Sequence, residues 1–152
     1  MLTDDEKNKL KTTLAEAMKN SYPKGATTTY AAAALTKSGN VYAAAQYFSD
    51  TYSLTLHGEQ CALVHAAAHG EGEIVAMAVL SNEKLEKGQS TQHPNASIKG
   101  AGFTPPCHMC KQLLYESQKR SGIPMTILLC NESGEEKELP LDAMLGLYPW
   151  PK

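Results

Sequence analysis

Long apolar runs and clusters of basic residues are both missing from this sequence. No stretch approaches the roughly 20 apolar residues that a helix needs to cross a bilayer, so we expect no membrane partner. Lys and Arg number 14 against 16 Asp and Glu, which gives a formal net charge of −2 at pH 7. Because nucleic-acid binding draws much of its affinity from basic side chains on phosphates, we expect no nucleic-acid partner, and a small-molecule substrate is favoured.

A secretory signal is missing as well. The first residues, MLTDDEKNKLKTTL, are charged and have neither an apolar centre nor a small-residue cleavage site, so we expect a cytoplasmic protein. Only four cysteines are present, and in a reducing compartment two of them at CxxC spacing indicate metal or redox chemistry before disulfides. The 152 residues, 42% of them hydrophobic, predict one globular domain over residues 1–152.

Helical and strand patterns alternate along the chain. The first helix is expected over residues 3–20, with Thr3 as its N-cap. A KSGN turn joins two strands expected over 27–35 and 41–48. The other expected elements are a helix over 58–69, a buried strand over 74–80, a long loop over 81–104, a helix over 107–121, strands over 125–130 and 136–139, and a helical turn over 141–145. This alternation predicts the α/β class, as a three-layer α/β/α sandwich around a mixed sheet.

Two short motifs hold the residues with the most specific chemistry. One is His57-Gly58-Glu59, at the start of an expected helix, and the other runs from Pro106 through Cys107 to Cys110, at the start of the next. Together they match the H-x-E and P-C-x-x-C signature of zinc nucleobase deaminases. A lone CxxC would fit a redox pair or half of a zinc ribbon equally well, so the specificity comes from the two motifs together.

The residue types in these motifs suit hydrolysis at a catalytic zinc ion. His57, Cys107 and Cys110 would bind Zn²⁺ and leave the fourth tetrahedral position open for water. Ligands in the first turns of helices lie among free backbone N–H groups, which favour thiolates. Zinc lowers the pKa of its bound water towards about 7. Glu59, two residues beyond the histidine, would take a proton from that water and deliver it to the ring nitrogen and the leaving amine.

On these residues, the sequence resembles the small, single-domain cytidine deaminase and blasticidin deaminase family. The resemblance covers nearly the whole chain, through TTTYAAAALTKSGNVYAAA, HGEQCALVHAAAHGEGEIVAMAVLSN, PPCHMCKQLL and LPLDAMLGLYPW, where Trp150 matches a terminal aromatic. It implies a five-stranded mixed sheet, a Zn²⁺ cofactor and a nucleoside-like substrate. It also implies a homotetramer, with a homodimer as the alternative, whose active sites lie near subunit contacts.

The expected substrate contacts depart from the family pattern. Standard cytidine deaminases carry an N-x-E-x-N-like segment whose Asn and Glu bind the ribose, and the matching residues 46–49 are QYFS, without the carboxylate. The family's Phe at the base pocket falls on Thr28. The change favours a blasticidin-like or another modified nucleoside over ordinary cytidine. Gln46, Phe48, Thr28 and His108 are the candidate substrate contacts, and His108 has solvent exposure as its alternative.

Other candidate residues have simpler interpretations. His65 and His69 are spaced i, i+4 like a metal pair but lack the Glu of an H-E-x-x-H motif, so packing or surface positions are expected. Cys61 and Cys130 are expected to be packed in the core, because free cysteine is among the most buried residue types.

The leading hypothesis is a zinc-dependent hydrolytic deaminase of a cytosine-type nucleoside or analogue, which converts an amine to a carbonyl and releases ammonia. The alternative is a non-catalytic, zinc-stabilised scaffold. Intact Glu59 argues against that alternative, and the missing ribose segment argues for it. Editing of single-stranded nucleic acid would need a basic, aromatic-lined groove, which the near-neutral charge disfavours.

Overall fold

The N-terminal helix is held at its start by a reciprocal cap. In the computed structural model, which describes residues 1–24, 29–82 and 102–146, helix α1 spans Asp4–Met18. The Thr3 hydroxyl accepts a hydrogen bond from the Glu6 amide at 3.2 Å, and the Glu6 carboxylate accepts one from the Thr3 amide at 2.8 Å. This capping box satisfies two amides that have no partner within the helix, so the expected N-cap is confirmed. Leu10 and Leu14 form the buried stripe of the helix.

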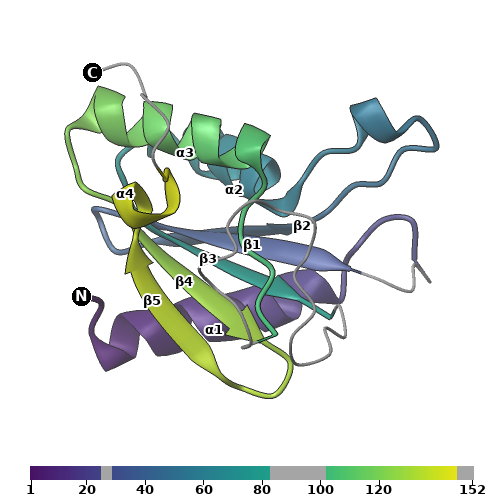
Figure 1. Ribbon diagram of the computed structural model, residues 1–152, viewed down its shortest axis with the longest axis horizontal. Coiled ribbons are helices and arrows are strands. Elements are labelled where there is room, and N and C mark those ends of the chain that lie inside the picture. The colour runs from purple at the N-terminus through teal and green to yellow at the C-terminus, as the bar shows by residue number, and fades with distance from the viewer. Residues whose placement is uncertain (25–28, 83–101, 147–152) are drawn as a thin grey trace.

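Five strands form one mixed sheet in the order β2-β1-β3-β4-β5 (Figure 1). They are β1 (Tyr30–Thr36), β2 (Val41–Ala45), β3 (Ile74–Ser81), β4 (Thr126–Asn131) and β5 (Glu136–Pro140). Only the β3–β4 pair is parallel among the pairs of this sheet, and the others are antiparallel. The predicted α/β class with five strands is therefore confirmed.

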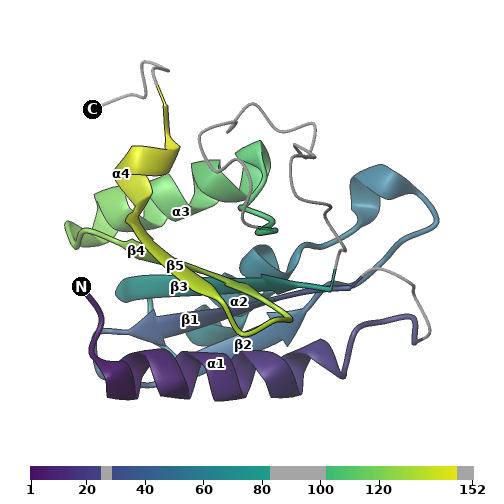
Figure 2. The ribbon, with the colours of Figure 1, turned by 60° about the horizontal axis from the view of Figure 1, so that its bottom comes forward.

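Helices cover both faces of the sheet. The remaining helices are α2 (Gly58–Ala68), α3 (His108–Ser121), the short α4 (Leu141–Met144) and the 3-10 turn η1 (Tyr52–Leu54). Figure 2 shows α1 on one face of the sheet and α3 with α4 on the other. Gly122 ends α3 in the left-handed region, at φ 70°, where glycine meets no steric penalty. In the part of the chain that the structure describes, no helix has both the length and the apolar character of a membrane span.

Strand β1 is unusual in its small side chains. Ala31, Ala33 and Leu35 face α1, whereas Ala32 and Ala34 face the layer of α2 and α3. Alanine is a poor strand former, but every one of these residues is buried, so packing against two helix layers outweighs propensity. Small side chains on both faces also let the helices approach the strand closely.

The expected hairpin exists, but its second strand is shorter than the predicted 41–48. The ladder with β1 ends at Ala45, and Tyr47 instead makes isolated bridges with Tyr22 and Leu56. Gln46 and Phe48 therefore lie beyond the strand, on the segment that leads to η1. Of the loop predicted over 81–104, Ser81 belongs to β3 and residues 102–104 have no regular structure. Its residues 83–101, like Thr28 and Trp150, lie outside the described residues.

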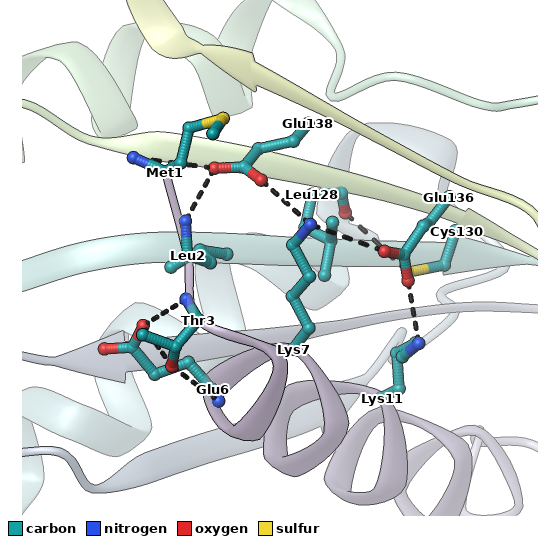
Figure 3. A network of polar contacts seen from close by, with 10 residues as sticks. All are labelled: Met1, Leu2, Thr3, Glu6, Lys7, Lys11, Leu128, Cys130, Glu136 and Glu138. Atoms are coloured by element: carbon teal, nitrogen blue, oxygen red, sulfur yellow. Dashed lines mark hydrogen bonds and ion pairs between the residues drawn. The ribbon is translucent and has the colours of Figure 1, made fainter.

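A charged network ties the start of α1 to the edge strand β5 (Figure 3). The Glu138 carboxylate accepts a hydrogen bond from the Leu2 amide at 2.7 Å and lies 3.1 Å from the Lys7 ammonium. Lys7 also pairs with Glu136 at 3.5 Å, and Lys11 pairs with the same carboxylate at 2.7 Å. Burial alone would raise the pKa of Glu138, but the Leu2 amide and Lys7 lower it on balance. The network therefore stabilises the ionised form of that carboxylate.

A second carboxylate, Glu71, fixes the β1–β2 turn against the end of α2. Its oxygens accept hydrogen bonds from Ser38 at 2.7 Å, Asn40 at 2.5 Å and Tyr42 at 3.1 Å. Side-chain hydrogen bonds, from Thr36, then Ser38 and Asn40, lower the pKa of Glu71 to about 2. A carboxyl with a depressed folded pKa adds stability at neutral pH and loses it as the pH falls through that pKa.

We expect Glu71→Gln to lower the melting temperature by about 2–4 °C at pH 7, and we expect the difference from the wild type to narrow as the pH falls from about 5 towards 3. Thermal unfolding followed by circular dichroism across that pH range measures the effect. Glu73→Gln is the matched control, because Glu73 lies two residues beyond Glu71 between α2 and β3, and its side chain, paired with Lys37 at 3.1 Å, is 54% exposed. Parallel curves for the wild type and Glu71→Gln would contradict the prediction.

Candidate metal centre and active site

His57 is held at the start of α2 by its own backbone. It is the N-cap residue of that helix, and its amide donates a hydrogen bond to the Gln60 side chain at 2.8 Å. Gln60 was not singled out from the sequence, although a Gln three residues after an N-cap is the capping-box spacing and was the available signal. The hydrogen bond fixes the backbone from which the His57 imidazole projects.

Two cysteines lie at the start of α3. Cys107 is the N-cap residue, and its sulfur accepts a hydrogen bond from the Cys110 amide at 3.5 Å. Helix α3 begins at His108, one residue later than the predicted Cys107. The buried Pro105 and Pro106 precede it, and proline is well suited to the chain just before or at a helix start because it needs no amide partner there. Both sulfurs therefore lie at the positive end of a 14-residue helix.

The fold brings His57, Cys107 and Cys110 together from two helices. His57 Nδ1 lies 3.3 Å from Cys107 Sγ and 3.4 Å from Cys110 Sγ, and the three ligand atoms all lie within 4.8 Å of one another. A tetrahedral zinc ion with Zn–N and Zn–S bonds of about 2.1 and 2.3 Å sets N and S about 3.6 Å apart. Three soft or borderline donors at this spacing suit Zn²⁺.

The thiols of this cluster share their protons unequally. The hydrogen bond from Cys110 lowers the pKa of Cys107 to about 3, against the opposing effect of burial, and His57 lowers it further. The same hydrogen bond and burial raise the pKa of Cys110. Hydrogen bonding within the cluster therefore favours the thiolate of Cys107, and a thiolate is the form of cysteine that binds metals.

Glu59 lies beside the cluster and is not one of its three metal-ligand candidates. Its side chain is partly buried and interacts with the Cys110 side chain. Burial raises the pKa of Glu59, and the neighbouring Cys107 thiolate raises it further. A carboxyl group in contact with one ligand of a metal cluster is placed to exchange a proton with a group at that metal.

A buried lysine supports the same helix turn. Lys111 exposes only 2% of its surface, and its ammonium donates a hydrogen bond to the Met144 carbonyl at 3.2 Å. The first turn of α3 is thereby joined to the end of α4. Local sequence contains little signal for this contact, because lysine is rarely buried and its partner lies 33 residues away.

The described candidate substrate contacts lie on two segments, one after β2 and one at the start of α3. Gln46 is buried and Phe48 is partly buried, on the segment after β2. His108 is exposed on the first turn of α3, next to Cys107. Thr28 lies outside the described residues. The role of these four residues in substrate binding stays a prediction.

The remaining candidate histidines and cysteines differ in how deeply they are buried. His65 and His69 are exposed and pack on Tyr42, with ring centroids 5.2 and 4.8 Å from its ring, as the surface interpretation predicted. Cys130 is buried, as expected, but the expected core position of Cys61 is wrong, because Cys61 is only partly buried. Cys61 lies on the first turns of α2, whose buried residues are Gly58, Ala62 and Ala66.

Comparisons with known proteins agree with this geometry. The model of the cytidine and deoxycytidylate deaminase zinc-binding region matches residues 4–125. A search of curated proteins found no match. Among solved structures, the cytidine deaminase of Burkholderia pseudomallei has 22% identity and a TM-score of 0.68, over 97% of this chain and 98% of that one. The cytidine deaminase of Mycobacterium tuberculosis has 19% identity and a TM-score of 0.67, over 99% and 100%. At these identities the likeness shows a shared fold.

Proposed function

Because this chain belongs to the cytidine and deoxycytidylate deaminase zinc-binding family, we propose that it deaminates a cytosine-type nucleoside or a nucleoside analogue by hydrolysis. Membership, shown by the match over residues 4–125, makes it a zinc-dependent deaminase. The observation that carries the finer proposal is the His57–Cys107–Cys110 cluster with Glu59 in contact with Cys110.

In this proposal His57, Cys107 and Cys110 bind the zinc ion, and Glu59 moves the protons. Bound zinc supplies Lewis-acid activation of a water molecule. Glu59 would take a proton from the attacking water, give one to the ring nitrogen and help the amine to leave as ammonia. One C–N bond breaks and one C–O bond forms, so the amidine and water become a carbonyl compound and ammonia. No redox partner is needed.

The substrate is proposed to be a modified or blasticidin-like nucleoside ahead of ordinary cytidine. Residues 46–49, QYFS, place no carboxylate where the family binds ribose. Gln46, Phe48, Thr28 and His108 are proposed to contact the substrate instead. Family membership disfavours the alternative of a zinc-stabilised scaffold without turnover, which would rest on the same missing carboxylate.

The test is ammonia release from zinc-loaded protein with cytidine, deoxycytidine, deoxycytidylate, cytosine, blasticidin S, modified cytidines, adenosine and guanine. Turnover of a cytosine-type member at a rate well above the others is the expected result. Turnover of adenosine or guanine alone would contradict the proposed substrate class. Silence across the panel, with one zinc ion per chain, would leave two explanations: a substrate outside the panel, or the scaffold.

We also propose that the protein is a cytoplasmic, single-domain homo-oligomer, a tetramer ahead of a dimer. Four apolar side chains on the segments around η1 expose half or more of their surface: Tyr22, Tyr47, Leu54 and Leu56. Tyr22 and Tyr47 stack at 4.9 Å between ring centroids, and both ribbon views show η1 extending away from the sheet (Figure 1, Figure 2). Exposed apolar groups gathered in this way favour a protein partner, and light scattering would give the number of subunits.

A further inference from the structure

The glycine between the two functional residues of α2 lies against the backbone of β1. Gly58 is the first residue of the helix and is buried. A Cβ atom added to it would lie 2.8 Å from the Ala32 nitrogen, 3.0 Å from the Ala31 carbonyl carbon and 3.1 Å from the Ala31 Cα. The start of α2 is therefore closer to the sheet than any residue with a side chain permits.

Glycine is required at position 58 because a Cβ atom has no room there, and not because of its backbone conformation. The described glycines with positive φ do not include Gly58, so its backbone is one that any residue adopts. At an ordinary helical position alanine is more favourable than glycine. The one property of glycine that the site uses is its missing Cβ.

The strand cannot easily give way to such an atom. All three contacted atoms belong to the backbone of β1, so no side-chain rotation relieves the contact. β1 lies inside the sheet, paired with β2 on one side and with β3 on the other. α1 covers its other face through Ala31 and Ala33. A Cβ at position 58 would therefore displace the first turn of α2 and not the strand.

The start of α2 contributes two of the four proposed functional residues, His57 and Glu59. His57 and Glu59 flank Gly58, and the Gln60 side chain holds the His57 amide at 2.8 Å, so residues 57–60 move together. Their partners, Cys107 and Cys110, belong to α3. A displacement of α2 would change the 3.3 and 3.4 Å separations of His57 Nδ1 from the two sulfurs without moving the cysteines.

We propose that Gly58 is a positioning residue: its contact with the β1 backbone sets how deep His57 and Glu59 lie relative to the two cysteines. The proposal rests on the proposed function only in the identity of the metal ligands. Metal release and a cobalt spectrum test it without any substrate, so its failure is distinguishable from the failure of the deaminase proposal.

The test is Gly58→Ala in the full chain. We expect zinc to be lost to a colorimetric chelator about 10- to 100-fold faster than from the wild type, as when a group that orients a metal ligand is removed. The visible absorption of the Co²⁺-substituted variant should change in position and intensity, because these bands report ligand geometry. With an active substrate, kcat should fall more than KM rises, since misplacement of a reacting group by about 1 Å can cost about 100-fold.

Two variants serve as controls. Gly72→Ala adds the same atom at a glycine with ordinary φ and nothing within 4 Å, and should match the wild type in both metal readouts. Ala66→Gly weakens α2 two turns away from the site, at a buried position, and should lower the melting temperature while leaving the cobalt spectrum unchanged.

A Gly58→Ala protein with wild-type zinc release and cobalt spectrum would overturn the proposal, whatever its melting temperature. Failure of this variant to fold at 15 °C, where Ala66→Gly folds, would also overturn it, because Gly58 would then serve the fold as a whole. Gln60→Ala gives an independent test, since it frees the same turn without adding an atom. Faster zinc release from that variant supports the role of the turn, and unchanged release contradicts it.

Discussion

Glu59→Gln is expected to lower ammonia release by about 10²–10⁴-fold, while zinc content and melting temperature stay close to those of the wild type. The amide keeps the size and one hydrogen-bonding oxygen of the carboxyl group but can no longer carry a proton. Because Glu59 lies outside the three-residue metal cluster, its replacement removes no ligand. Steady-state ammonia release, metal analysis and thermal unfolding of the same preparation measure the three quantities.

Glu116→Gln is a suitable control for this variant. Glu116 is a partly exposed carboxylate on α3 that pairs with Arg120 at 2.9 Å, away from the metal cluster by almost two helical turns of sequence. Its replacement should leave ammonia release unchanged. Full activity of Glu59→Gln would refute the proton-transfer role, and loss of zinc from that variant would instead make Glu59 a metal ligand.

Cys107→Ala is expected to lose the zinc ion and much of the stability of the protein. Zinc at about 1,000 times its dissociation constant stabilises the native state by about 4 kcal/mol, which in a chain of this length corresponds to about 8–16 °C in melting temperature. Cys107 is one of the three residues of the metal cluster, so alanine removes a thiolate ligand and leaves two. Metal analysis and thermal unfolding, with and without added zinc, measure both losses.

Cys61→Ala is the matched control, because Cys61 is a partly buried cysteine one turn beyond His57. It should keep one zinc ion per chain and lose only a little packing. If Cys107→Ala also kept one tightly bound zinc ion, the proposed ligand set would be wrong. If it lost zinc but melted as the wild type does, the metal would have no structural role.

Local patterns predicted most of the fold correctly. The Thr3–Glu6 spacing, the KSGN turn and Gly122 each act through contacts within a few residues, so the sequence contains the whole cause. The second strand was predicted too long because the apolar pattern continues through Tyr47 and Phe48 after the ladder ends. Tyr47 leaves that ladder to pair with Tyr22 and Leu56, and such distant partners have no local signal.

The candidate site likewise contains some residues that the sequence identifies and some contacts that it does not. His57, Cys107 and Cys110 were identifiable because metal binding constrains residue type and spacing, and the structure brings these three together. The tight contact of Gly58 with β1 could not be identified from the sequence. One glycine at a helix start has many explanations, and only the position of a distant strand selects among them. The burial of Lys111 likewise depends on where α4 ends.

The two edge strands of the sheet, β2 and β5, differ in how strongly their residues oppose pairing with a further strand. β5, with the sequence EKELP, ends in Pro140 and carries Glu136, Lys137 and Glu138, and charges and proline at a border discourage pairing with another chain. β2, with the sequence VYAAA, has no charged residue, and His65 contacts the Ala43 carbonyl on it at 3.1 Å. Among the described residues, charge and proline therefore disfavour strand addition at β5 more than at β2, where His65 already contacts one backbone carbonyl.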